Sequence, residues 1–311
     1  MRKRLVTLVG LLQAAAILTI AFSVITLLPA DDFALQLFSH FRPQYLVVST
    51  LLLLVFVVLR RYRYAGTLLL VSILNVSLVL PWYYDTTEND AGTDLELLLV
   101  NVLSTNIEYD RLFDLLDAED ADIVVLLEVS PDWLVALDAL RSTYPWSYAE
   151  ARDGNFGIAL FSRLPIKSVN HVDSPPFGYP TINASLTVGE ESLHVVATHP
   201  MIPVGRRMYE ARNEQLESLP GLLGKPAGAT ILLGDLNTAM WEPNYRSLEY
   251  STGLKNARRG FGIVPTWPTF LPFAMIPIDH VLVSQEIGVK GVRTGQRIGS
   301  DHLPLIVTLT M

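Results

Sequence analysis

The chain has 311 residues, of which half are hydrophobic and only 17% are charged. Because soluble domains carry about 25% charged residues, this composition excludes an ordinary, wholly soluble protein. The absence of cysteine excludes disulfides and thiolate metal sites. Residues 1–82 have a net charge of +5, and residues 83–311, with 16 basic and 29 acidic side chains, have −13. A hydrophobic, basic head therefore precedes an acidic body.

The head contains three apolar runs, at residues 5–28, 45–59 and 65–82. The first is uncharged and long enough to cross a bilayer as a helix, for which about 20 residues suffice. The second is short, but the arginines that follow it can extend to the interface. The sequence thus predicts about three transmembrane helices within residues 1–84.

Loop charges predict the orientation of these spans. The chain starts Met-Arg-Lys-Arg, the loop between Ala30 and Pro43 contains Asp31 and Asp32, and the loop 60–63 is basic again. The positive-inside rule places the basic segments in the cytoplasm, so everything after Trp82 lies outside it. We therefore expect a multi-pass protein of the cell (inner) membrane with an extracytoplasmic body. Two alternatives stay open, a cleaved signal peptide for the first run and a re-entrant or buried helix pair for the other two.

Residues 85–94 are polar and aperiodic, as in a linker, and a body follows over residues 95–311. Helical periodicity is present at 108–118 and 205–219, and Ser130 with Pro131 marks the start of a helix that runs to Leu140. Short apolar runs predict strands at 95–103, 122–127, 157–162, 182–188, 192–198, 229–233, 278–284 and 303–309. This pattern predicts an α/β domain of sheets covered by helices.

Polar residues stand at the ends of several of these strands, where sites are commonly built. Glu128 follows a buried strand and offers the oxygen ligand that a hard divalent cation needs. Asp235 and Asn237 follow another, and point to one side if the extended backbone continues. The Asp can activate a water and the Asn can hold a phosphate oxygen. Solvated loop or turn residues are the alternative for each.

Further candidates are Asn101, His199, Asp279 and the pair Asp301 and His302, each at the start or end of a strand. An Asp next to a His suits metal binding or acid–base catalysis, and Asp279 could hold a His ring in one tautomer. Taken singly, such residues are more often structural. If the strands lie side by side, the set supplies the metal ligand, base and phosphate contacts that phosphoryl transfer to water requires.

The order and spacing of these segments resemble the endonuclease/exonuclease/phosphatase superfamily over residues 95–311. The matching pieces are Asn101 in NVL, Glu128 in LLEVS, FGIALFSR (156–163), THP (198–200), GDLN (234–237), IDHVLVS (278–284) and SDHLP (300–304). The resemblance implies a four-layer α/β/β/α sandwich with the chemistry of a divalent-metal-dependent phosphoric ester hydrolase, a phosphodiesterase or phosphatase, that uses Mg²⁺ or Mn²⁺.

The resemblance also implies residue roles. Glu128 is the main metal ligand with Asn101 beside it, and Asp301 helps with the metal or with orienting the histidine. Asp235 activates the attacking water, and Asn237 positions phosphate and water. His302 contacts the phosphate and is paired with Asp279, and His199 contacts the phosphate or donates a proton.

Two positions depart from the pattern. Many members have Gln before the metal-binding Glu, where this chain has Leu127, and DNA-repair members often have an acidic residue where it has Leu103. The three apolar runs together with TWP (266–268) and GSDHLP make the chain similar to a bacterial membrane-anchored branch that includes members associated with glycopeptide resistance.

We therefore expect a membrane-anchored phosphoesterase acting at the extracytoplasmic face, on a lipid-linked or other envelope phosphate. The alternatives are a metal-dependent nuclease and a catalytically inactive membrane-tethered binding module. The acidic body disfavours nucleic acid as a partner, and Arg206, Arg207 and Arg212 form either a local basic patch or a solvated helix face.

The stretch 261–278 is rich in apolar side chains and has four prolines, so we expect a loop that borders the site. Its candidates for exposed side chains are Trp267, Phe270, Leu271, Phe273, Met275 and Ile276. They either contact an acyl or prenyl chain or pack down as a lid.

Overall fold

The computed structural model describes residues 7–27, 33–84, 92–224 and 228–311. The chain divides into two compact units, Met1–Pro81 and Trp82–Met311. Most of the predicted linker, residues 85–91, lies outside the described residues.

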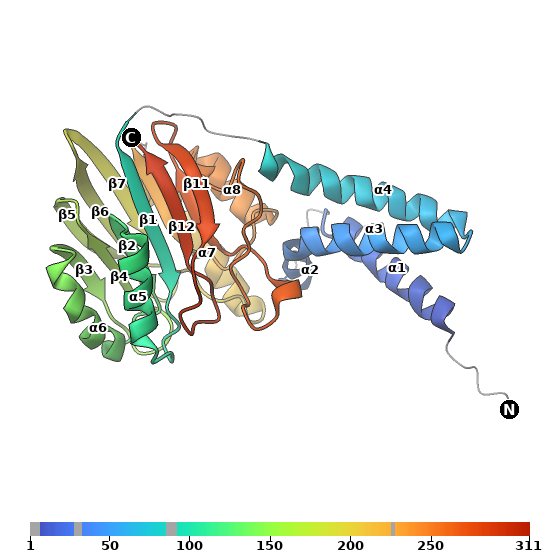
Figure 1. Cartoon of the computed structure of the whole chain (residues 1–311), viewed down its shortest axis with the longest axis horizontal. Helices are drawn as coiled ribbons and strands as arrows, with labels where there is room; N and C mark the ends of the chain where they lie inside the picture. The colour runs from blue at the N-terminus through green and yellow to red at the C-terminus, as the bar shows by residue number, and fades with distance from the viewer. Residues whose placement is uncertain (1–6, 28–32, 85–91, 225–227) are drawn as a thin grey trace. The chain divides into compact units, whose positions relative to one another are not determined.

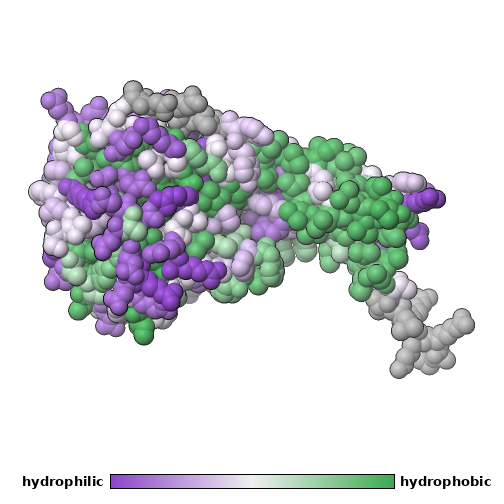
Figure 2. Space-filling model, viewed as in Figure 1, coloured by the Kyte–Doolittle hydropathy of each residue, from purple (hydrophilic) through white to green (hydrophobic). Residues whose placement is uncertain are grey.

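The first unit consists of apolar helices. Three helical stretches are long and apolar enough to cross a membrane, at Leu8–Ile25, Phe33–Val58 and Tyr62–Tyr83. The helices within them are α1 (Leu8–Ile25), α2 (Phe33–Phe38), η1 (Ser39–Phe41), α3 (Arg42–Val58), α4 (Tyr62–Val79) and η2 (Leu80–Tyr83). Hydrophobic side chains cover most of the visible surface of α3 and α4 (Figure 2), in keeping with helices that are apolar enough to cross a membrane.

The second stretch differs from the prediction, because residues 33–41, expected within a loop, are helical. Phe33, Leu35, Leu37 and Phe38 supply apolar helix-compatible side chains there. Pro43 does not end the helix, since it lies in the first turn of α3, where its missing N–H is not needed.

The second unit contains two six-stranded mixed sheets (Figure 1). The first has the strand order β11-β12-β1-β2-β4-β3 and the second β5-β6-β7-β8-β10-β9. The strands of the first sheet are β1 (Asp94–Asn101), β2 (Ile123–Leu127), β3 (Trp146–Glu150), β4 (Ile158–Ser162), β11 (Gly288–Thr294) and β12 (Leu305–Thr310). Those of the second are β5 (Ile166–Ser174), β6 (Tyr179–Val188), β7 (Glu191–Ala197), β8 (Thr230–Asp235), β9 (Lys255–Asn256) and β10 (Asp279–Val283).

Alternation along each strand divides the apolar side chains between two cores. In β1, Leu95, Leu97 and Leu99 pack between the two sheets, whereas Leu98 and Val100 face the helices. Since successive strand residues point to opposite faces, a strand with apolar residues at every position must be covered on both sides. This double burial explains the continuous apolar runs at residues 97–100 of β1, 123–127 of β2 and 231–233 of β8.

Helices complete the layers of the α/β/β/α sandwich, which confirms the predicted fold class. α5 (Tyr109–Glu119) and α6 (Pro131–Leu137) cover the first sheet through a cluster that includes Leu112 and Trp133. α7 (Arg206–Leu223) and α8 (Pro243–Thr252) pack against each other and reach the second sheet, where Tyr245 of α8 accepts a hydrogen bond from Asn256 of β9 at 2.6 Å. Ser130 caps α6 as predicted, accepting the Trp133 N–H at 3.2 Å.

Candidate active site

The central strands of both sheets end in polar residues. In the first sheet, β1 and β2 are parallel neighbours, and Asn101 pairs with Leu127, the residue before Glu128. In the second sheet, β8 and β10 are antiparallel, and Asp235 pairs with Asp279. Because the strand pairing fixes both positions, each sheet delivers two polar side chains next to each other.

Glu128 leaves the strand in a left-handed conformation, with φ 62°, and is buried. Its Oε1 accepts a hydrogen bond from the Asn101 side-chain amide at 3.0 Å, and its Oε2 accepts one from the Ser104 backbone N–H at 3.2 Å. No described arginine or lysine forms an ion pair with this carboxylate. The hydrogen-bond donors that the described residues offer to this carboxylate are neutral amides, so the carboxylate suits a cation.

The GDLN segment forms a tight turn at the end of β8. A Cβ on Gly234 would lie 1.8 Å from the Thr198 carbonyl oxygen, so only glycine permits this approach of β7 and β8. Asp235 Oδ1 accepts the Asn237 N–H at 2.9 Å. The prediction that Asp235 and Asn237 share one side of an extended strand is wrong, because Asn237 has φ 50° and the chain turns. The Asn237 amide donates instead to the Pro200 carbonyl at 3.0 Å.

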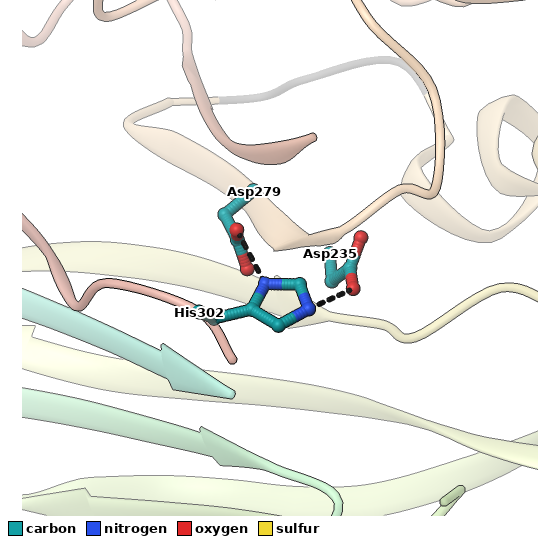
Figure 3. A group of neighbouring side chains, drawn as sticks. All are labelled: Asp235, Asp279 and His302. Atoms are coloured by element: carbon teal, nitrogen blue, oxygen red, sulfur yellow. Dashed lines mark hydrogen bonds and ion pairs between the residues drawn. The ribbon is translucent and has the colours of Figure 1, made fainter. Parts of the chain in front are cut away.

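His302 lies between two carboxylates (Figure 3). Its Nδ1 is 2.9 Å from Asp279 Oδ2, and its Nε2 is 3.6 Å from Asp235 Oδ2. Burial by itself would lower the pKa of His302, but the charge and hydrogen bond of Asp279, helped by Asp235 and Asp301, raise it to about 9. Burial would raise the pKa of Asp279, and the contact with His302 lowers it instead. The imidazole is therefore a cation at neutral pH, with Nε2 directed at Asp235.

His199 is buried in the same site. Its ring lies 5.5 Å from the Phe156 ring, and its Nε2 is 3.6 Å from Asp235 Oδ2, which is an ion-pair separation longer than a hydrogen bond. Neither ring nitrogen forms a hydrogen bond with a described residue. Burial would lower the pKa of His199, but the neighbouring carboxylates Asp235 and Glu128 raise it.

Asn101 links the two sheets. Its amide nitrogen lies 3.4 Å from Asp235 Oδ2 and 3.5 Å from His302 Nε2, in addition to its bond to Glu128. One contact network therefore contains predicted site residues from several strand ends: Asn101, Glu128, His199, Asp235, Asp279 and His302.

Asp301 lies beside this network with its carboxylate held elsewhere. Its Oδ2 accepts the indole N–H of Trp267 at 2.9 Å, and its carbonyl accepts the Thr269 N–H at 2.9 Å. A direct role in metal binding for Asp301 stays a prediction.

Several supporting residues were not identified from the sequence. Ser104, which donates to Glu128, also donates through its hydroxyl to Asn155 at 2.8 Å. Arg258 is fully buried and adds to the low pKa of Asp279. The local sequence does not distinguish Arg258 from the adjacent Arg259, which is only half-buried.

Arg212 corrects both expectations for the α7 arginines, since it belongs neither to a basic patch nor to a solvated face. It is buried and paired with the equally buried Glu242, and it donates to the Asn237 carbonyl at 2.9 Å. Arg206 and Arg207 are exposed.

Carboxylates and a histidine are close enough in this site to hold a metal ion. Asp235, Asp279 and His302 offer ligand atoms that all lie within 4.8 Å of one another. The carboxylate oxygens of Glu128, which lie in the same contact network, also suit a hard divalent cation.

A family model matches this arrangement. The model of the Endonuclease/Exonuclease/phosphatase family matches residues 98–302, which include every predicted site residue. The chain belongs to this family. Members are metal-dependent phosphoesterases or nucleases, so a hydrolase is the expected activity. No curated protein gives a significant match.

Solved structures of the family share the fold. A humanized D. rerio TDP2 is 18% identical, with a TM-score of 0.61 over 70% of this chain and 99% of that chain. An endonuclease/exonuclease/phosphatase from Beutenbergia cavernae is 19% identical, with a TM-score of 0.59 over 70% of this chain and 72% of that chain. The human Nocturnin catalytic domain, with a bound sulfate anion, is 18% identical, with a TM-score of 0.58 over 71% and 96%.

Proposed function

We propose that this protein is a membrane-anchored phosphoesterase that hydrolyses a phosphate ester at the extracytoplasmic face of the membrane. The observation that carries the proposal is the cationic His302, held by Asp279 and directed at Asp235, beside a buried Glu128 that forms no ion pair with a described arginine or lysine. Such a site combines a carboxylate that can take a proton, a fixed positive charge for a phosphate oxygen and a place for a cation.

Each polar side chain of the site has a separate role in the proposed reaction. Asp235 accepts a proton from the attacking water, whose oxygen forms the new bond to phosphorus. His302 and Asn237 contact the non-bridging oxygens, and His302 supplies positive charge where negative charge accumulates. As the bond from phosphorus to the leaving oxygen breaks, the protonated His199 gives that oxygen a proton.

Mg²⁺ or Mn²⁺ would be held by Glu128 with Asn101 and Asp301. The buried carboxylate of Glu128, which accepts a hydrogen bond from the Asn101 amide, supports this assignment. When bound, the ion supplies Lewis-acid stabilisation of the phosphate and leaving group.

The substrate that we propose is a lipid-linked phosphate ester. Three helices of the chain are long and apolar enough to span a membrane, and the third ends at Tyr83, beside the first residues of the second unit. Residues 83–311 carry a net charge of −13, which repels long polyanions. One observation supports the nuclease alternative: D. rerio TDP2, which shares the fold, has been solved in complex with a single-stranded DNA product.

A substrate screen tests the proposal. The full chain in detergent or lipid discs, with Mg²⁺ or Mn²⁺, is given lipid phosphates, lipid diphosphates, phospholipids and single-stranded DNA. We expect turnover of a lipid-linked ester that chelation abolishes, and a loss of at least about 10²-fold in kcat for each of Glu128→Gln, Asp235→Asn and His302→Ala.

Asp173→Asn is the matched control, because Asp173 is a carboxylate on the edge strand β5 that is mostly exposed and outside the network. Full turnover in excess chelator, or wild-type rates in all three site variants, would refute the hydrolase. Turnover of DNA alone would replace our substrate with the nuclease alternative.

A further inference from the structure

The loop that follows β9 and leads to Asp279 has an exposed apolar tip, Phe270-Leu271-Pro272-Phe273, which we call the tip loop. Phe270 is 71% exposed and Phe273 is 78% exposed. From residue 92 onward in the described chain, other large exposed hydrophobic side chains occur singly along the sequence, as is normal for a protein surface. A run of adjacent exposed apolar residues is unusual on a protein surface and indicates that the tip loop contacts an apolar partner.

The structure separates the tip from its base. Trp267 and Ile276 pair as an antiparallel bridge that closes the loop, and Ile276 is buried. The expectation of exposure is therefore wrong for Ile276, because this residue belongs to the closing pair. The alternative that the phenylalanines pack down as a lid is also wrong, since both side chains point into solvent.

The base of the loop is tied to the segment that carries the candidate site. Thr269 N–H donates to the Asp301 carbonyl at 2.9 Å, and Leu303 N–H donates to the Thr266 carbonyl at 2.8 Å. The Trp267 indole holds the Asp301 carboxylate. Whatever the tip contacts is therefore fixed relative to His302, one residue from Asp301.

Charge indicates the chemistry of the partner. The 18 residues 261–278 contain no charged side chain, although the body as a whole is strongly acidic. An exposed cation, Arg297, lies at the loop and donates to the Thr269 carbonyl at 2.6 Å. Phenylalanines in an uncharged segment, with an exposed arginine at the same loop, suit a bilayer surface, with apolar groups among acyl chains and the cation at lipid phosphates.

The chain's own connections favour a lipid bilayer over a partner protein. The third apolar stretch ends at Tyr83, and Trp82, the first residue of the second unit, accepts backbone hydrogen bonds from Gly260 at 3.0 Å and Gly262 at 2.9 Å. The loop segment is therefore bonded, eight residues before Phe270, to Trp82, a residue that also belongs to the third apolar stretch of the sequence.

We propose that the tip loop inserts Phe270 and Phe273 into the lipid bilayer and so holds the catalytic site over phosphate esters at the membrane surface. This inference rests on the proposed membrane anchorage and deepens the proposed function. It assigns to Phe270 and Phe273 the selection of substrates that stay in the membrane.

A lipid-contact measurement tests the insertion without any turnover. Because the chain has no cysteine, Phe273→Cys gives a single attachment site for a fluorophore on the full chain. The labelled protein is reconstituted in vesicles of phosphatidylcholine and phosphatidylglycerol, with and without nitroxide-labelled lipid. We expect strong quenching by the nitroxide lipid and weak quenching by aqueous iodide.

Val135→Cys is the matched control. Val135 is 78% exposed, the same fraction as Phe273, and lies on α6, at the other side of the sandwich from the orange segment that contains the tip loop (Figure 1). We expect quenching there by iodide only. Equal responses to both quenchers at the two positions would overturn the proposal, and so would iodide quenching alone at position 273.

A kinetic comparison tests the consequence for substrate choice. Phe270→Ser/Phe273→Ser, which changes exposed side chains only, should keep its kcat/KM on a short-chain, water-soluble ester. On the same head group carried by a long chain it should lose at least about 10-fold, since burial of one Phe is worth more than a tenfold factor. Equal losses on both carriers would contradict the proposal. If the wild type hydrolyses neither ester, the proposed function fails, while the quenching result still decides the insertion.

Discussion

At the level of single residues, the charge of His302 sets what the site can bind. The ring has Asp279 at one nitrogen and Asp235 at the other, and all three side chains are buried. Removing charges from water is costly, and mutual attraction with good hydrogen-bond geometry offsets that cost. The arrangement therefore favours an imidazolium that is ready to meet a phosphate.

The raised pKa of His302 makes a pH prediction. Since its pKa rises from the ordinary 6.5 to about 9 on folding, the stabilisation that it contributes is complete below pH 6.5 and is lost as pH rises through about 9. In the metal-free full chain, histidine-selective NMR should show one of the six imidazoles titrating near pH 9. His302→Ala assigns that signal by removing it.

Asp279→Asn sharpens the same prediction, because it removes the largest stabilising contact of the imidazolium. The titration of His302 should move to lower pH, and the loss of stability on the alkaline side should begin earlier. Asp173→Asn, beside the partly exposed His171, should leave the His302 titration unchanged. A His302 signal that titrates near 6.5 in the wild type would contradict the assigned charge.

At the level of elements, a buried ion pair connects α7 to the turn after β8. Arg212 and Glu242 are both 1% exposed, and Arg212 also donates to the carbonyl of Asn237. The Thr238 hydroxyl contacts Glu242 as well. The pair therefore fixes the backbone of the turn whose side chains, Asp235 and Asn237, do the chemistry that we propose.

This connection predicts separate effects on stability and on activity. Glu242→Gln should destabilise the protein by about 3–5 kcal/mol, because it leaves the Arg212 cation buried without a counter-charge. Arg212→Met/Glu242→Leu should recover much of that loss, since neither charge remains. The kcat of the double variant should stay depressed by up to about 10²-fold, because the Asn237 carbonyl has lost its donor and the turn is misplaced.

Denaturant unfolding and steady-state kinetics on the same preparations check these effects. Arg206→Met is the control, as Arg206 and Glu210 form an exposed pair on the same helix, worth less than about 1 kcal/mol. Full recovery of kcat together with stability would show that the pair serves folding alone.

Elements with two buried faces were predictable from the sequence, and edge elements were not. β1, β2 and β8 contain continuous apolar runs that lead into polar residues, so both the strands and the meeting of their ends could be expected. β5 is largely exposed and polar, and β11 contains two glycines and a bulge between Val289 and Gly291, so neither has a strand-like pattern. Such strands form because the neighbouring strand pairs with them.

The supporting residues of the site could not be predicted either, because their positions depend on tertiary contacts. An arginine in a sequence predicts a solvated side chain, and only the tertiary contact with Glu242 makes Arg212 buried. The turn at Asn237 likewise depends on Asp235 accepting its N–H, which a strand pattern does not reveal. Strand ends were therefore predicted well, and the partners that hold them were not.

At the level of the whole molecule, the hydrophobic and the acidic parts of the sequence coincide with the two units of the structure. The three apolar stretches lie before Trp82 except for their last two residues, and the acidic α/β sandwich follows. Polar contacts also join the helices of the first unit, since the buried Arg42 donates to the Ser23 carbonyl at 2.8 Å and Asn75 donates to the Ser23 hydroxyl at 3.1 Å. Hydrogen-bonded polar groups between apolar helices suit an assembly that must satisfy its own backbone and side chains in lipid.

Three helices are long and apolar enough to cross a membrane; three crossings would place the two ends of the chain on opposite sides of it, and the basic segments at residues 2–4 and 60–63 predict that the N-terminus is cytoplasmic. The catalytic unit should then be extracytoplasmic. In spheroplasts, a membrane-impermeant maleimide should label Val135→Cys on α6 before permeabilisation and Arg61→Cys only after it, both positions being exposed in a chain without native cysteines. The opposite order of labelling would place the site in the cytoplasm. One span separates the two positions, so an inverted topology would exchange the sides on which they lie. Labelling of both positions before permeabilisation would instead mean that Tyr62–Tyr83 does not cross the membrane, and would contradict the three-span topology.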